Sequence, residues 1–179
     1  MHRLFVALRP PRHIREQLLD LMEGLPGARW QDDDQLHLTL RFIGAVDARV
    51  ADDVAAALAG VRHPPVTMRL DGVGKFGSRG RANAIWAGVR PADELARLHR
   101  KIDQALVRAG LEPEHRAYLP HVTVARLGRD AADPDAWIAR HAGLASADFT
   151  VDHFALFESQ LGHAGAAYEL VERYPLAPS

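Results

Sequence analysis

Two copies of one short pattern are the part of this 179-residue sequence best suited to chemistry. The pattern occurs as His37-Leu38-Thr39-Leu40 and again as His121-Val122-Thr123-Val124. In a strand, residues i and i+2 point to the same face, so each copy presents an imidazole and a hydroxyl together while its aliphatic side chains enter the core. Two such imidazoles facing each other can serve as the acid and the base of one proton-transfer reaction.

A single tetrapeptide of this kind occurs often by chance, but these two copies stand at corresponding places of a repeat. His121 lies 84 positions after His37, and the same shift carries the apolar helical positions around Ile14 onto those around Leu98. A duplicated lobe explains this correspondence, and two lobes packed about a pseudo-twofold axis would bring the pairs together across a cleft. The other eight histidines have no comparable neighbours, and we interpret them as structural or solvated.

Hydrophobic periodicity predicts the elements that hold these patterns. In the first half we expect, in order, a strand over 4–8, a helix over 14–22, a strand over 36–43, a helix over 50–61 with Asp47 as its N-cap, and a strand over 66–70. The glycine-rich and basic stretch 72–81 is either the connection between the lobes or a long hairpin.

The second half repeats the order of strands and helices. We expect a strand over 84–89, a helix over 95–106, a strand over 119–127, a short helix over 135–141 with Asp133 as cap and Pro134 first, a strand over 149–157, and a hairpin strand over 167–172 after a turn at Gly162 and Gly165. The sequence thus predicts an α+β protein, a single bilobal domain over 1–179 with repeat halves at about 1–75 and 82–179.

Composition excludes several classes of protein. Hydrophobic residues make up 47% of the chain and charged residues 25%, as in ordinary globular proteins. The 22 basic and 23 acidic residues give a net charge of −1, too little positive charge for a broad duplex-binding surface. No cysteine is present, which excludes disulfide scaffolds, zinc ribbons and thiol nucleophiles. The apolar runs are too short for a signal peptide or a membrane span, so we expect a cytoplasmic protein.

The motifs resemble those of the two-histidine (2H) phosphoesterase superfamily, and within it the bacterial and archaeal RNA 2',3'-cyclic phosphodiesterases, also known as 2'-5' RNA ligases. The resemblance spans nearly the whole chain and departs at no motif position. It implies an antiparallel-rich sheet with two helices in each lobe, and a metal-free cleft between the lobes. The supporting stretches are Arg3–Leu8, His37–Gly44, Ile85–Val89, Pro120–Arg126, Phe154–Ser159 and Tyr168–Leu170.

The resemblance also implies a role for each histidine, which the symmetry of the sequence alone leaves open. His37 would donate a proton to the leaving 3'-oxygen and His121 would accept one from water, leaving a 2'-phosphomonoester. In-line displacement at phosphorus needs a base beside the water and an acid on the opposite side. The hydroxyls of Thr39 and Thr123 would bind the non-bridging phosphate oxygens.

Two arginines and one phenylalanine are further candidates for substrate contacts. Arg126 resembles a phosphate-neutralising residue, although ideal alternation places it opposite His121, so that a β-bulge would be needed. Arg41 shares the face of His37 by the same alternation. Either arginine could instead form a solvated salt bridge. Phe42 alternates into the core, so we expect it to pack there rather than to touch a terminal base.

Other mechanisms lack a matching pattern. Asp32, Asp33 and Asp34 could in principle hold a metal, but they precede the strand in what reads as a solvated loop, and neither motif has a carboxylate beside it. No glycine-rich loop precedes a helix, so ATP-dependent ligation has no site. We therefore expect no metal and no cofactor.

The sequence thus predicts hydrolysis of 2',3'-cyclic phosphate ends of RNA or of small nucleotides by a monomer without an obligate protein partner or a membrane. Within enzymes, the alternatives are reversible ATP-independent 2'-5' RNA ligation and a phosphodiesterase for a small cyclic nucleotide. The alternative of another class is a module that binds RNA ends without turnover.

Overall fold

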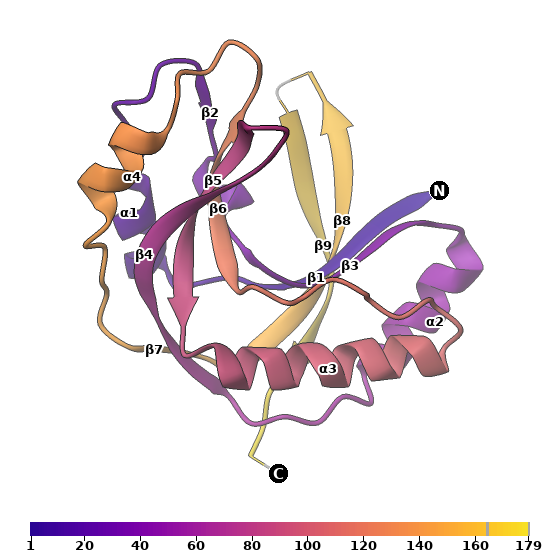
Figure 1. Cartoon of the computed structure of the whole chain (residues 1–179). Coiled ribbons are helices and arrows are strands. Elements are labelled where there is room, and N and C mark those ends of the chain that lie inside the picture. Colours follow the sequence, from indigo (N-terminus) through magenta and orange to yellow (C-terminus); the bar gives the residue numbers. More distant parts are fainter. Residues whose placement is uncertain (164, 179) are drawn as a thin grey trace.

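A nine-stranded sheet with four helices around it forms the body of the protein (Figure 1). The computed structural model describes residues 1–163 and 165–178. In chain order the elements are β1 (His2–Leu8), α1 (Arg12–Leu19), β2 (Ala28–Trp30), the 3₁₀ helix η1 (Asp33–Gln35), β3 (Leu38–Val46), α2 (Ala48–Leu58), β4 (Val66–Ser78), β5 (Arg81–Arg90), α3 (Ala92–Arg108), β6 (His121–Leu127), α4 (Asp135–His141), β7 (Phe149–Val151), β8 (His153–Gly162) and β9 (Gly165–Pro175).

The two histidine strands are neighbours at the middle of the sheet. The strand order is β7-β4-β5-β6-β3-β1-β8-β9, with β2 added on β6, and every pairing is antiparallel. β3 and β6 meet through the pair Leu38 and Val122. The α+β fold with an antiparallel sheet and four helices, predicted from the sequence, is confirmed.

The sheet does not group the chain into its first and second halves. β3 and β1 continue into β8 and β9 from the end of the chain, whereas β6 and β5 continue into β4 and β7. The strand β4, which precedes the boundary between the expected repeat halves, therefore lies on the His121 side. The lobes seen in the sheet are thus interleaved in sequence.

Helices cover the sheet with apolar faces spaced as expected. In Figure 1, α2 and α3 lie along one side and α1 and α4 along another. α3 packs against β3 and buries Leu95, Leu98 and Ile102, each completely removed from solvent. Burying one such side chain stabilises the fold by about 1.5–3 kcal/mol. The expected cap of α2 is also present, because the Asp47 carboxylate accepts from the Val50 N–H at 2.9 Å. No helix in the described part of the chain is long and apolar enough to cross a membrane.

One expected element needs correction, one open alternative is decided, and one strand was not predicted. The strand expected over 149–157 is two strands: β7 pairs with β4 and β8 pairs with β1, and only Asp152 separates them. The chain changes neighbours there because the sheet curls, which brings its two ends together. The stretch 72–81 is the long hairpin, one of the two alternatives for it, since β4 extends to Ser78 and pairs with β5. The strand β2 was not predicted.

Smaller differences concern element ends. The turn expected at Gly162 and Gly165 joins β8 to β9 as predicted, although residue 164 within it lies outside the described residues. The helix expected over 135–141 is α4, with Pro134 rather than Asp133 at the N-cap position; the Asp133 carboxylate accepts from the Asp135 N–H at 2.8 Å.

Candidate active site

A β-bulge in β3 decides which side chains join His37 on its face. Along β1, Ala7 pairs with Thr39 and Val6 with Arg41, so Leu40 is an extra residue. An extra residue reverses the alternation of the strand. Leu40 and Arg41 are therefore both buried, and Phe42 lies on the Thr39 side with 51% of its surface exposed. The expectations that Arg41 shares the His37 face and that Phe42 enters the core were both wrong for this reason.

The same bulge recurs in β6. Trp86 of β5 pairs with Thr123 and Ile85 with Ala125, which leaves Val124 as the extra residue. Val124 and Ala125 are both fully buried, and Arg126 follows on the exposed side that carries Thr123. The bulge that Arg126 requires to reach the histidine face is thus present.

A cavity of about 260 Å³ brings most of the predicted residues together. Arg41 is not among its lining side chains. Its side chain is 6% exposed, and the guanidinium donates through Nε to the Asp103 carboxylate at 2.8 Å and through its other nitrogens to the Phe42 and Glu112 carbonyls. The cavity is lined by Phe5, His37, Thr39, Phe42, Phe76, His121, Thr123, Arg126, Ser159 and Tyr168.

His37 is held by its own loop and by aromatic rings. Its Nδ1 lies 2.7 Å from the Gln35 carbonyl oxygen, to which it donates, and its Nε2 lies 3.1 Å from the Thr39 hydroxyl. The rings of Phe5 and Tyr168 are 4.9 and 5.1 Å away, centroid to centroid. Burial, with smaller contributions from nearby positive charge, lowers the pKa of His37 to about 4 against the opposing effect of the Gln35 carbonyl.

His121 repeats this arrangement with different neighbours. Its Nδ1 donates to the Leu119 carbonyl at 2.7 Å, and the rings of Phe76 and Trp86 lie 4.8 and 5.9 Å away. Burial and the charge of Arg126 lower the pKa of His121, again against the effect of its carbonyl partner. Both imidazoles are therefore neutral at neutral pH in the free protein.

A glycine allows the Trp86 ring to take its place behind His121. A Cβ atom on Gly74 would lie 2.4 Å from that ring, so any side chain at position 74 would collide with it. β4 can therefore pass close to the indole only with glycine at this point.

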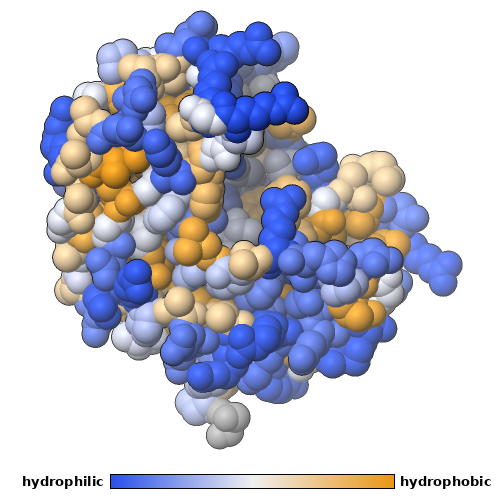
Figure 2. All heavy atoms as spheres, viewed as in Figure 1, coloured by the Kyte–Doolittle hydropathy of each residue, from blue (hydrophilic) through white to orange (hydrophobic). Residues whose placement is uncertain are grey.

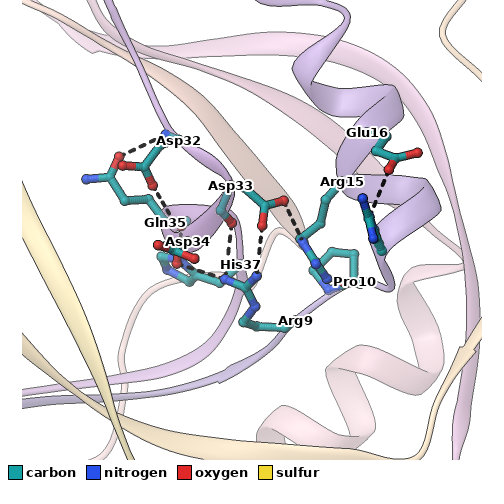
Figure 3. Close-up of polar contacts among 10 residues, drawn as sticks. Arg9, Pro10, Arg15, Glu16, Asp32, Asp33, Asp34, Gln35 and His37 are labelled. Carbon is teal, nitrogen blue, oxygen red and sulfur yellow. Dashed lines mark hydrogen bonds and ion pairs between the residues drawn. The ribbon is translucent and has the colours of Figure 1, made fainter.

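The loop before β3 is braced by two arginines (Figure 3). Arg9 donates to the carbonyl oxygens of Asp33 and Asp34 at 3.2 and 2.8 Å, and Arg15 donates to the Asp33 carboxylate at 2.8 Å. The expectation that this acidic stretch is simply solvated was therefore wrong for Asp33, which pairs with both arginines.

A capping box completes the brace. The Asp32 carboxylate accepts from the Gln35 N–H, and the Gln35 side chain accepts from the Asp32 N–H, each at 3.0 Å. These bonds fix the residue whose carbonyl orients His37.

Comparison with known proteins agrees with this geometry. A family model described as the 2'-5' RNA ligase superfamily matches residues 10–163. The chain belongs to this superfamily. Among relatives of the superfamily, RNA 2',3'-cyclic phosphodiesterases from Thermotoga maritima and Escherichia coli are each 28% identical, over 94% and 97% of this chain and 92% and 96% of their own lengths. A Geobacillus stearothermophilus relative of the same name is longer, and the 28% identical match spans only 50% of it.

Solved structures of superfamily members have the same fold. E. coli LigT in its apo form superimposes with a TM-score of 0.80 at 27% identity, covering 99% of this chain and 98% of LigT. LigT complexed with 3'-AMP gives a TM-score of 0.79 at 26% identity, covering 99% of both chains. The family predicted from the motifs is confirmed.

Four residues of this superfamily site were not predicted: Phe5, Phe76, Ser159 and Tyr168. All four come from strands other than the two motif strands and lie far from the motifs in sequence, so only the tertiary fold gathers them. Phe42 is different, because it lies 84 positions before Arg126. Applying the repeat to the bulge expected at Arg126 would have placed Phe42 on the cavity side as well.

Proposed function

We propose that this protein is a metal-independent phosphodiesterase that opens the 2',3'-cyclic phosphate at an RNA 3' end to a 2'-phosphomonoester. The observation that carries the proposal is the joint placement of His37, His121 and Arg126 around one cavity by two bulged strands. The names of the superfamily relatives support the same reaction class.

The proposed mechanism uses the two imidazoles on opposite sides of phosphorus. His121, neutral in the free protein, takes a proton from the attacking water. His37 gives a proton to the leaving 3'-oxygen, and a group with a low pKa is a strong acid once it is protonated. The anionic substrate offsets the positive charge that depresses the pKa of His37, and thereby favours the protonated ring in the complex.

Charge on the phosphate is met by donors of the cavity. The Arg126 guanidinium and the hydroxyls of Thr39 and Thr123 line the space between the imidazoles. Such donors stabilise the charge that grows on non-bridging oxygens in the transition state. Among the described residues that line this cavity, none has a carboxylate, and a fixed guanidinium disfavours a divalent cation beside it.

The test is hydrolysis of a short RNA with a 2',3'-cyclic end, with the 2'- and 3'-phosphate products separated by chromatography. We expect the 2'-phosphate, at the same rate in excess EDTA. No turnover by the wild-type protein would leave only a module that binds RNA ends. A 3'-phosphate product would overturn the assigned acid and base, and loss of activity in EDTA that one divalent ion restores would overturn the metal-free mechanism.

Ligation is a second candidate, which the superfamily description supports. A 5'-hydroxyl of RNA in place of water would open the cyclic phosphate by the same displacement without ATP, forming a 2'-5' phosphodiester and releasing the 3'-hydroxyl. Adding a 5'-hydroxyl RNA to the assay and searching for a 2'-5' joined product tests it. The proposal also includes a cytoplasmic monomer.

A further inference from the structure

We infer that Tyr118 is a positioning residue, which fixes the backbone of Thr39 against the strand that carries His121. The inference rests on the proposed function. Tyr118 lies in the loop that leads from α3 to β6, and its hydroxyl donates to the Thr39 carbonyl at 3.0 Å. One side chain from the approach to the second motif thus holds the backbone of the first.

The two motif strands part as soon as they have met. Among the described strands, β3 and β6 pair only at Leu38 and Val122. Beyond this pair, the chain that precedes β6 is the loop 109–120 and not a strand. The surface is hollowed between the β4–β5 side and the β1 side of the molecule (Figure 2). The catalytic cavity therefore lies between two strands that are joined by a single pair of residues.

Side chains donate to the edge of β3 that β6 leaves. The bonds run from the Tyr118 hydroxyl to the Thr39 carbonyl, from His99 Nδ1 to the Leu40 carbonyl, and from the Arg41 guanidinium to the Phe42 carbonyl. Backbone acceptors away from water need a donor, and these three bonds supply one along the bulge. His99 belongs to α3 and Arg41 to β3 itself, so Tyr118 is the donor that lies next to the second motif.

The Tyr118 ring is fixed in place. It stacks on His99 with centroids 4.4 Å apart and planes 8° apart. Burial raises the pKa of Tyr118 above its ordinary value of 10.0, so the hydroxyl keeps its proton at neutral pH. The hydroxyl is therefore a permanent donor at a fixed position.

Each end of this connection reaches a catalytic imidazole. The Thr39 hydroxyl lies 3.1 Å from His37 Nε2. Leu119, the neighbour of Tyr118 in the chain, supplies the carbonyl that accepts from His121 Nδ1 at 2.7 Å. A shift of the Thr39 backbone would move a phosphate donor relative to both imidazoles. Small errors in the alignment of reacting groups slow the chemical step.

The His121 side of the cavity does not depend on Tyr118. β6 pairs with β5 along most of its length, and Thr123 lies opposite Trp86 in that ladder. β2 holds the end of β6. Deleting the Tyr118 hydroxyl should therefore loosen the backbone at Thr39 and leave Thr123 in place.

The first test removes a single oxygen atom. Tyr118→Phe keeps the stacked ring and deletes the donor, and should lower kcat on a cyclic-ended RNA about tenfold while KM changes by less than about twofold. Tyr174→Phe is the matched control, because Tyr174 also stacks on a ring and donates to a carbonyl, that of Ala55 at 2.9 Å, and does not line the cavity. Both variants should lower the unfolding midpoint by similar amounts, but only Tyr118→Phe should lower kcat.

The outcomes of this test separate the inference from the proposed function. With an active wild-type protein, an unchanged kcat in Tyr118→Phe, a loss confined to KM, or an equal loss of kcat in Tyr174→Phe would overturn the inference alone. No turnover of cyclic-ended RNA by the wild-type protein would overturn the proposed function and this inference with it.

The second test asks whether Tyr118 acts through Thr39. Thr39→Val should lower kcat by a smaller factor in the Tyr118→Phe background than in the wild-type background, because the hydroxyl is already displaced there. Thr123→Val should lower kcat by the same factor in both backgrounds. Single-turnover kinetics measure both cycles. Independent losses for Thr39→Val and Tyr118→Phe would overturn the assigned route.

The third test needs no substrate. The ¹⁵N chemical shifts of the imidazoles in the free protein report the hydrogen bonds of each ring nitrogen. Tyr118→Phe should shift the His37 Nε2 signal, since the Thr39 hydroxyl moves, and should change the His121 signals less. Tyr174→Phe should shift neither. An unchanged His37 signal in Tyr118→Phe would contradict the inference.

Discussion

His37 and His121 hold their rings in the same way and differ in what surrounds them. Each Nδ1 donates at 2.7 Å to the carbonyl oxygen two residues earlier, and each strand bulges just after its threonine. Past the bulge, the cavity receives Phe42 from one strand and Arg126 from the other. The same β-bulge thus places an apolar side chain in the cavity from β3 and a cationic one from β6.

This difference shows how a duplicated motif can handle an asymmetric substrate. A 2',3'-cyclic nucleotide presents a charged phosphate and an uncharged nucleoside, and the two strands offer one group of each kind. Two aromatic rings flank each imidazole, but the Nδ1 bond of His37 is partly buried whereas that of His121 is exposed. The following predictions test whether these differences matter.

The largest effect is expected from removing either imidazole. His37→Ala and His121→Ala should each lower kcat by at least ~10², the usual scale of a general acid or base. In the double variant, the fold decrease in kcat should be much smaller than the product of the two single-variant decreases, because both groups act in one step. Single-turnover kinetics on a cyclic-ended RNA measure this, with His13→Ala, an exposed histidine on α1, as control. Near wild-type turnover in either single variant would contradict a two-histidine mechanism.

The pH dependence of stability should distinguish the two histidines. The pKa of His37 falls from an ordinary 6.5 to about 4 in the folded protein, so between those values the unfolded state binds the extra proton. The free energy of unfolding should therefore fall as pH decreases from 6.5 to 4, by at most about 3 kcal/mol from this group.

Urea unfolding at several pH values measures this dependence. His37→Gln should flatten the curve over that interval more than His121→Gln does. An equal flattening in both variants would show that the enclosure of His37 has no energetic consequence.

The two arginines should separate activity from stability. Arg126→Ala removes a charged donor to the phosphate and should raise the activation free energy by about 2 kcal/mol, which lowers kcat/KM roughly 30-fold. Because Arg126 is exposed, the unfolding midpoint should change little. Arg126→Lys should recover part of this loss, since it keeps the charge but not the planar donors.

Arg41→Ala is the contrasting variant, because it leaves the Asp103 carboxylate without its ion-pair partner. It should destabilise the fold by about 3 kcal/mol. If Arg126→Ala also lost stability without losing kcat/KM, its placement in the catalytic cavity would have no functional meaning.

The smallest effect is expected from the threonines. Thr39→Val and Thr123→Val should each raise the activation free energy by about 1 kcal/mol and so lower kcat roughly fivefold, because a hydroxyl donor to the phosphate is lost. Valine keeps the β-branched shape, so the strands should survive. A plot of log kcat/KM against pH should stay bell-shaped with its limbs in place, since hydroxyls do not titrate in this range. Unchanged kcat in both variants would reduce these threonines to strand residues.

The repeat made the central part of the site predictable. Strict alternation and the 84-position offset placed His37, Thr39, His121 and Thr123 on facing strands, and the cavity contains all four. The bulges at Leu40 and Val124 were not predictable locally, since both residues are apolar as in any buried strand. The exchange of Arg41 for Phe42 on the cavity side could have been predicted only by carrying the bulge that Arg126 requires back by 84 positions.

The division of 149–157 into β7 and β8 could not be predicted from the sequence for a related reason. Apolar residues alternate with polar ones from Phe149 to Asp152 and then run without interruption from Phe154 to Phe157, and the polar pair Asp152-His153 between them does not by itself mark a change of partner strand. What separates the two strands is the curl of the sheet, which depends on all of its members. Periodicity reports which face of a strand is buried and does not report its neighbours.

The interleaved order of the sheet sets the order in which the two sides can form on a growing chain. The strands β4 to β7 emerge from the ribosome as one stretch, Val66 to Val151, so the His121 side can pair from nearby segments. The His37 side waits for the last hairpin, whose Tyr168 completes its aromatic wall and whose Ala166 carbonyl receives the Gln35 amide at 2.7 Å. A nascent chain stopped before β8 thus contains Arg126 and both imidazoles, but it lacks Tyr168 beside His37 and the Ala166 carbonyl that receives the Gln35 amide. The lining of the catalytic cavity is therefore complete only after Tyr168 of β9 has been translated.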